Sequence, residues 1–194
     1  MSASEQTAVE RFGSGPAILL LHGGSGPELT WDRQMELAQR WSLIIPTRRG
    51  FAPSAAAPGD LEADAEDVDR LLTKRTHLVG IAYGGLVAAL AAQRNPQAVR
   101  SLTLIEAPPE FAQEPLLDLD ALARAGIPVM VVSSGRQKDV EASSDAVAKR
   151  LRARRELVSG EDGEDEVVSR APGFNEVLED FLRGSAGTAR FRTA

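Results

Sequence analysis

The chain has 194 residues and a formal net charge of −6, from 22 basic and 28 acidic side chains. This acidic balance argues against a nucleic-acid partner, because a polyanion would be repelled overall. The absence of cysteine excludes disulfides, thiolate catalysis and thiolate metal ligands, and no apolar run approaches the roughly 20 residues of a membrane helix. The polar N-terminus lacks a signal-peptide pattern, so we expect a cytoplasmic protein, and the excess of arginine and alanine suggests a bacterial one.

In chain order, short apolar or β-branched runs predict strands at 7–12, 17–21, 42–46, 77–80, 101–105, 127–132 and 156–159. The run AILLL at 17–21 is typical of a parallel strand that is buried on both faces. Helical spacing of apolar residues predicts helices at 31–40, 61–72, 84–95, 119–125, 140–151 and 174–183. Thr30 is the expected N-cap of the first helix. The acids that flank the apolar stripe of the second helix are expected to face solvent, and they are Glu62, Asp64, Glu66 and Asp67.

Strands and helices alternate with short connections, which predicts the α/β class, with a mostly parallel central sheet covered by helices on both faces. We expect one domain over residues 1–183 and a flexible tail over 184–194. Ligands of such sheets bind beyond the carboxyl ends of the strands. The acidic run at 161–166 has no ligand spacing, so it predicts a solvated loop, and we expect neither a metal nor a cofactor.

The segment Gly80-Ile81-Ala82-Tyr83-Gly84 lies between a predicted strand and a predicted helix. It resembles the nucleophile elbow of the α/β-hydrolase superfamily, Gly-x-Ser-x-Gly, whose glycines permit a sharp turn. Ala82 stands where the family has its serine. Alanine has no lone pair with which to attack a carbonyl carbon, so acyl transfer through this position is impossible as written.

Three further motifs follow the same family order. LLLHGG at 19–24 resembles the oxyanion loop, and the resemblance implies N–H donors from Gly24 or Ser25 and from Tyr83, with His22 in a structural role. PTRRGFAPS at 46–54 resembles the Asp-x-Arg-Gly loop, with Thr47 replacing the aspartate, and the segment 170–183 resembles the C-terminal helix. Between Pro109 and Ile127 the chain is too short for the family's helical cap, which implies an open site.

The resemblance also implies a base and an acid that this chain does not supply in full. The family's histidine position falls near Asp165, so the histidine is lost, and the chain's other histidine, His77, is expected to be an ordinary strand-end residue. A carboxylate near Asp165 cannot replace imidazole without a large rise in pKa. Glu106 and Asp139 are the alternatives for the acid, and we favour Glu106.

Three functions remain open from the sequence. The first is a pseudoenzyme that binds a small apolar or carbonyl-containing molecule, with a homodimer or protein partner as an alternative cover for the open site. The second is a non-triad enzyme, such as a cyclase, isomerase or lyase, with Glu106 or the Tyr83 hydroxyl handling the proton. The third is a carboxylic-ester hydrolase that has been disabled or redesigned. The fold alone does not decide among them.

Overall fold

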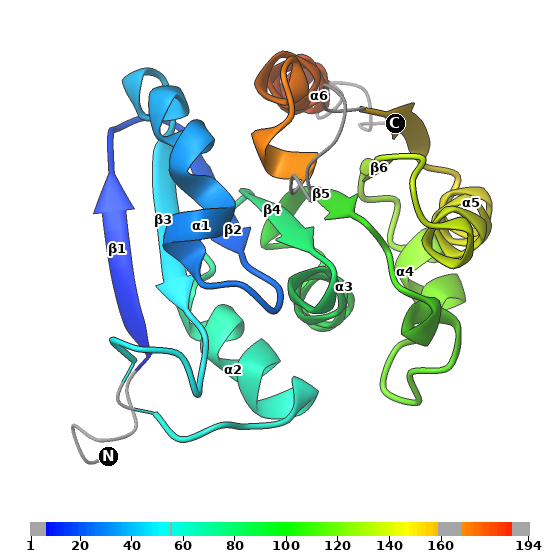
Figure 1. Cartoon of the computed structure of the whole chain (residues 1–194), viewed down its shortest axis with the longest axis horizontal. Helices are drawn as coiled ribbons and strands as arrows, with labels where there is room; N and C mark the ends of the chain where they lie inside the picture. The colour runs from blue at the N-terminus through cyan, green and yellow to red at the C-terminus, as the bar shows by residue number, and fades with distance from the viewer. Residues whose placement is uncertain (1–6, 55, 159–167, 188–194) are drawn as a thin grey trace, which may run out of the picture.

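A computed structural model describes residues 7–54, 56–158 and 168–187, and these form a seven-stranded sheet in the order β1-β3-β2-β4-β5-β6-β7. The strands are β1 (Ala8–Phe12), β2 (Ala17–Leu21), β3 (Ser42–Thr47), β4 (Thr76–Ile81), β5 (Val99–Ile105), β6 (Val129–Ser133) and β7 (Arg154–Leu157). Only β1 runs antiparallel to its neighbour. The predicted α/β class with a mostly parallel sheet is therefore confirmed (Figure 1).

Helices cover both faces of the sheet, as predicted (Figure 1). One face carries α2 (Leu61–Leu71), α3 (Tyr83–Arg94), α4 (Leu119–Arg124), α5 (Lys138–Leu151) and the short 3-10 helix η3 (Pro109–Ala112). The other face carries α1 (Pro27–Trp31), η4 (Val168–Arg170), α6 (Phe174–Gly187) and the 3-10 helix η2 (Asp32–Gln39).

The alternation of side chains along β2 shows why the sheet is buried on both sides. Leu19 and Leu21 pack into the core beneath α2 and α3, whereas Ile18 and Leu20 pack into the core beneath η2 and α6. All four side chains are completely buried. A strand that contributes to two cores has no polar face, which is the reason for the uninterrupted apolar run.

The predicted helix at 31–40 is wrong in both its start and its type. The chain turns into α1 at Pro27, a favourable first helical residue, and then tightens into η2 from Asp32 onward. Thr30 is not an N-cap, because it lies inside α1 and its Oγ1 donates a hydrogen bond to the Gly26 carbonyl oxygen at 2.8 Å. The 3.6-residue pattern did not distinguish an α-helix from a 3-10 helix over so short a segment.

Helix α6 continues to Gly187, past residue 184 where the sequence predicts the tail to begin. Ser185 is buried there, and its hydroxyl donates to the Phe181 carbonyl oxygen at 2.8 Å. Residues 188–194, and the acidic run at 161–166, lie outside the described residues.

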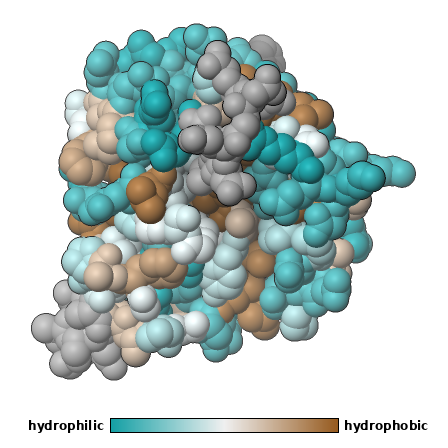
Figure 2. All heavy atoms as spheres, viewed as in Figure 1, coloured by the Kyte–Doolittle hydropathy of each residue, from teal (hydrophilic) through white to brown (hydrophobic). Residues whose placement is uncertain are grey.

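The surface in Figure 2 is mostly hydrophilic, with hydrophobic residues in separate small patches. Across residues 7–54, 56–158 and 168–187, no helix is long and apolar enough to span a membrane.

Candidate functional site

The turn between β4 and α3 has the shape of the elbow that its glycines predict. A Cβ atom on Gly80 would lie 2.3 Å from the Gly84 carbonyl oxygen, and one on Gly84 would lie 2.2 Å from the Leu21 carbonyl oxygen. Both distances are far inside van der Waals contact, so only glycine fits at either position. The close approach brings the start of α3 against the end of β2, where the predicted oxyanion loop begins.

Ala82 stands at the apex of this turn with φ 49° and ψ −118°. L-residues with a side chain rarely adopt this conformation, and such residues cost about 1–3 kcal/mol each. The Ala82 N–H is held by the Ile105 carbonyl oxygen at 2.8 Å, so the end of β5 fixes the strained residue in place. The apex of the turn therefore carries a strained backbone and a side chain without a hydroxyl.

Replacing Ala82 with glycine is therefore expected to stabilise the protein by about 1 kcal/mol, because glycine adopts positive φ without strain and only part of that gain is lost to its greater freedom when unfolded. Urea unfolding of the variant and the unaltered protein measures the difference. The matched control is Ala142→Gly on the exposed face of α5, which should destabilise instead. Equal destabilisation by both changes would show that Ala82 is not strained.

The predicted oxyanion donors lie on the two segments that meet at the elbow. Gly24 is exposed, and a Cβ atom built on it meets nothing within 4 Å, so its backbone borders open space. Ser25 follows it in the same loop, and Tyr83 is the first residue of α3, where backbone N–H groups have no acceptor inside the helix. The role of these three N–H groups stays a prediction.

His22 is committed to the structure of the oxyanion loop. The Arg48 backbone N–H donates to its Nε2 at 3.0 Å, so the proton of the neutral ring is on Nδ1, which donates to the Ser25 carbonyl oxygen at 2.7 Å. Burial, together with the positive charge of Arg48, lowers the pKa of His22 from 6.5 to about 4. A neutral ring with both nitrogens occupied cannot accept a proton from a ligand.

Arg48 joins the oxyanion loop to α2 and to the elbow. Its guanidinium donates to the carbonyl oxygens of His22 at 3.0 Å and Gly23 at 2.7 Å, and it pairs with the Asp64 carboxylate at 3.0 Å. The aromatic rings of Phe51 and Tyr83 lie 5.0 Å and 4.5 Å from the guanidinium carbon, within the range of cation–π attraction. Arg48 occupies the second position of the Asp-x-Arg-Gly-like loop, and its role was not predicted from the sequence.

The expectation that the acids of α2 face solvent is wrong for two of the four. Asp64 and Asp67 are 4% and 8% exposed. Asp64 binds Arg48, and Asp67 accepts hydrogen bonds from Arg49 at 2.7 Å and from the Thr7 hydroxyl at 2.6 Å. Burial alone would raise the pKa of Asp67, but these bonds and one from Arg70 hold it below its usual value. Asp64 and Asp67 thus bind the two arginines of the loop that follows β3 and fix this loop against α2.

Tyr83 does not suit the role of a proton acceptor. Burial and the neighbouring Asp64 carboxylate raise the pKa of its phenol to about 12. The hydroxyl therefore keeps its proton at neutral pH and cannot take one from a ligand.

The two alternatives for the acid lie in different settings. Glu106 follows β5 with φ 52°, and its Oε1 accepts the Ser134 backbone N–H at 2.8 Å, so the carboxylate fastens the loop after β6 to the loop after β5. Asp139 is exposed in the first turn of α5, beside Pro109 and Ser143 in an apolar hollow of about 420 Å³. The sequence did not predict the role of Glu141. Its carboxylate accepts hydrogen bonds from the Ser133 hydroxyl, the Gly135 N–H and the Arg155 guanidinium.

The sequence predicted that the second histidine, His77, is an ordinary strand-end residue, but the structure shows a buried one. His77 is completely buried in β4, with Nδ1 2.7 Å from the Ser101 hydroxyl oxygen and its ring edge-to-face with Trp41. Burial, with Arg100 and Arg75 nearby, lowers its pKa to about 4. Asp165, the predicted position of the lost histidine, lies outside the described residues. Each of the chain's two histidines therefore serves the fold.

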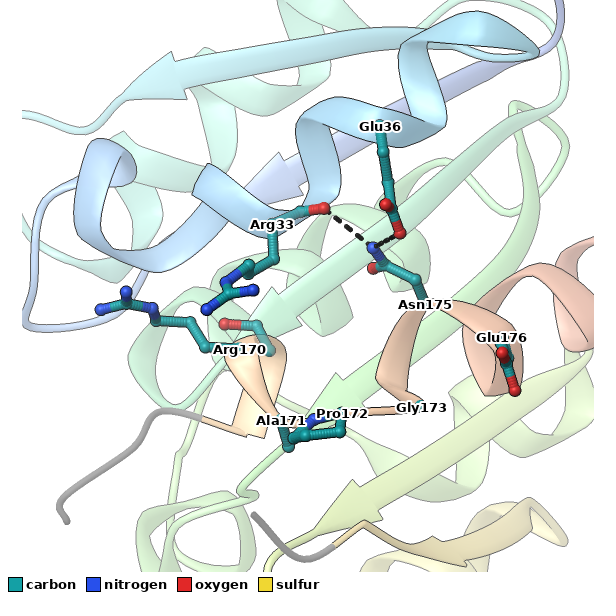
Figure 3. A pocket seen from close by; sticks show the side chains of 9 residues that line it. Arg33, Glu36, Arg170, Ala171, Pro172, Gly173, Asn175 and Glu176 are labelled. Carbon is teal, nitrogen blue, oxygen red and sulfur yellow. Dashed lines mark hydrogen bonds between the residues drawn. The ribbon is translucent and has the colours of Figure 1, made fainter. Parts of the chain in front are cut away.

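A polar hollow of about 390 Å³ lies between η2 and the start of α6 (Figure 3). Arg33 and Arg170 line one part of it, and Asn175 donates hydrogen bonds to the Arg33 carbonyl oxygen and to Glu36. No residue of the elbow or the oxyanion loop lines this hollow. It is therefore separate from the predicted site.

Comparisons with known proteins agree with this geometry. A family model described as "Alpha/beta hydrolase family" matches residues 18–192, so the chain belongs to the α/β-hydrolase family. It is 36% identical over 109 residues to a pimeloyl-[acyl-carrier protein] methyl ester esterase of Aeromonas hydrophila, a match covering 54% of this chain and 42% of that protein. The pimeloyl-[acyl-carrier protein] methyl ester esterase of Chromobacterium violaceum is 33% identical over 130 residues, and the match covers 64% of this chain and 50% of that protein. The matched part thus spans half or less of these curated relatives.

Two solved structures share the fold at low sequence identity. A carboxylesterase of the thaumarchaeon Nitrososphaera gargenis superposes with a TM-score of 0.77 at 14% identity, covering 93% of this chain and 95% of that one. A thermophilic esterase of Thermogutta terrifontis gives 0.77 at 19% identity, with 92% and 93% covered. At such identities the likeness shows the fold alone.

Proposed function

We propose that this chain is a non-hydrolytic member of the family, which binds a small apolar or carbonyl-containing molecule at the elbow without cleaving it. The observation that carries the proposal is the state of the elbow. Its strained apex and close-packed glycines are intact, but the apex residue is alanine and both histidines are committed to the fold. A carbonyl oxygen near Ala82 would find hydrogen-bond donors but no nucleophile and no imidazole base among the described residues.

The chemistry of the ligand follows from what the site retains. Backbone N–H groups at Gly24 or Ser25 and at Tyr83 suit an oxygen acceptor. The relatives named as methyl ester esterases favour an acyl carbonyl over other acceptors. The non-triad enzyme is less favoured, because Tyr83 is not a base and the Glu106 carboxylate is held by the Ser134 N–H.

A single cysteine tests this proposal, because the chain has none of its own. In Ala82→Cys, the thiolate can attack the carbonyl carbon of p-nitrophenyl acetate, forming a thioester and releasing p-nitrophenolate. If the N–H donors face the apex, this acylation should be at least about tenfold faster than in Ala142→Cys, a matched exposed thiol on α5. The release of one equivalent of p-nitrophenolate measures it, corrected for the thiolate fraction from the pH dependence.

The unaltered chain should show no turnover of the same ester, and observed turnover would contradict a non-hydrolytic function. Equal acylation rates in the two cysteine variants would contradict a carbonyl-binding elbow. The double reversion Ala82→Ser with Asp165→His, chosen at position 165 from the sequence alone, should restore turnover only if hydrolysis was lost while the acyl site was kept.

A further inference from the structure

Strand β7 forms one edge of the sheet, because it is the last strand in the order and pairs with β6 on its inner side. The Val158 N–H donates to the Ser133 carbonyl oxygen at 2.9 Å, so the backbone N–H of Val158 points toward β6. Backbone groups alternate in direction along a strand, so those of Arg155 and Leu157 point away from the sheet. Among the described residues these groups meet no further strand, and such an edge is a template for pairing with another chain.

The side chains of β7 leave this edge accessible. Arg155 turns back toward its own α5, where its guanidinium donates to Glu141 at 2.6 Å and to Asp145 at 2.9 Å. These two carboxylates more than balance its charge, so Arg155 presents no net positive charge to an approaching strand. Leu157 is 61% exposed, although it is a large hydrophobic residue. Pairing at the edge would therefore also cover apolar surface.

The charges of β7 are complementary to those of a second copy of the same strand. Two identical edge strands related by a twofold axis pair in antiparallel fashion, with one residue opposite its own copy at the axis. When that residue is Arg155, Arg154 of each copy lies opposite Glu156 of the other. Arg154 and Glu156 point to the same face, since they form an ion pair at 2.6 Å within the chain. Opposite charges that face each other across an antiparallel pair are stabilising.

The other edge strand, β1, lacks this complementarity. Its two charged residues, Glu10 and Arg11, are adjacent in the strand, so their side chains point to opposite faces of the sheet. Residues that lie directly opposite in a twofold antiparallel pair share a face, so Glu10 cannot lie opposite Arg11 of a second copy. Of the two edges of the described sheet, β7 is therefore the one whose charges fit a second copy.

We infer that two copies of the chain pair through β7, so that their sheets join into one continuous sheet across a twofold axis. Arg155 lies at the axis, with one pair of Arg154 and Glu156 on either side of it. The exposed Leu157 lies opposite Ala153 of the second copy and is covered there. The elbow follows β4, which β5 and β6 separate from β7, so this pairing does not involve the elbow.

Sedimentation velocity over a concentration series tests the pairing. The mass of the unaltered chain should rise from that of one copy toward that of two as the concentration is raised to about 500 μM, because a short edge pairing gives a weak dimer. Arg154→Glu and Glu156→Arg should each raise the dissociation constant at least about tenfold, since each change places like charges opposite each other on both sides of the axis. Both side chains are partly exposed, so both variants are expected to fold, and urea unfolding checks this.

Mixing the two variants is the sharper test. In a mixed dimer the glutamate of Arg154→Glu faces the arginine of Glu156→Arg, so both opposite pairs attract again. An equimolar mixture should therefore dimerise to within about threefold of the unaltered dissociation constant. Arg11→Glu, an exposed charge reversal on the β1 edge, is the matched control and should leave the dissociation constant unchanged. A monomer at every concentration would overturn the proposal. So would a single β7 variant that dimerises as well as the unaltered chain, a mixture that stays monomeric, or loss of the dimer in Arg11→Glu.

Discussion

Replacing Arg48 with methionine is expected to destabilise the protein by about 3–5 kcal/mol. The change leaves the Asp64 carboxylate buried at 4% exposure without its cation, and it also removes the donors to the carbonyl oxygens of His22 and Gly23. Urea unfolding should show a lower midpoint with an unchanged slope, because the loss is of native interactions and not of compactness.

Two further variants separate the buried charge from other effects. Adding Asp64→Leu to Arg48→Met should recover much of the loss, because the unpaired carboxylate is then gone. Arg150→Met removes a bidentate pair with Asp120 that is fully exposed, and it should cost much less. If Arg48→Met and Arg150→Met lower the free energy of unfolding by similar amounts, the burial of the Arg48–Asp64 pair does not increase its contribution to stability.

The contacts that hold the elbow and the oxyanion loop in place are independent of any catalytic group. Arg48 holds the oxyanion loop, and Ile105 holds the apex of the elbow, through contacts that do not involve a nucleophile. An alanine at the apex in place of the family's serine therefore lacks a hydroxyl but disturbs none of these contacts. The shape of the turn therefore does not depend on a nucleophile, which supports the proposed binding function.

The sequence predicted those features that depend on local pattern. The run AILLL identified β2 to the residue, and the spacing of Gly80 and Gly84 identified a turn in which neither glycine tolerates a Cβ atom. Both signals are strong because close packing leaves few alternatives at these positions. Ala82 could be placed at the apex for the same reason, since the turn fixes which residue stands there.

The features that the sequence missed depend on partners distant along the chain. Asp64 reads as a solvent-facing acid of an amphipathic helix until Arg48, sixteen positions earlier, is brought against it. His77 reads as a strand-end residue until Ser101 and Trp41 enclose it. Glu141 likewise gains its role only when Arg155 of β7 lies beside it. Periodicity reports which face of an element is polar, but it does not report which polar residues are paired in the interior.

Lowering the pH from 7 to 4.5 is expected to destabilise the protein strongly through its two histidines. Both are neutral when folded, with pKa values lowered from 6.5 to about 4, His22 by burial and Arg48, and His77 by burial and the two nearby arginines. The unfolded chain therefore takes up protons that the folded chain does not. The stabilisation is complete above about pH 6.5 and is lost as the pH falls toward 4, by about 3 kcal/mol for each histidine. That sum is a large part of the total stability of an ordinary domain.

Urea unfolding at half-unit steps of pH measures this loss, and the histidine signals of a ¹⁵N NMR spectrum assign it, because only two rings contribute. His77→Gln removes one titrating group, so the dependence of the unfolding free energy on pH between 6.5 and 4.5 should fall to about half. Asp67 and Glu179, whose pKa values are lowered, add their loss mainly below about pH 4.5, so they overlap only the acid end of this window. A flat stability between pH 7 and 5 would mean that the histidines titrate normally in the folded protein, and that His22 remains available as a base beside the elbow.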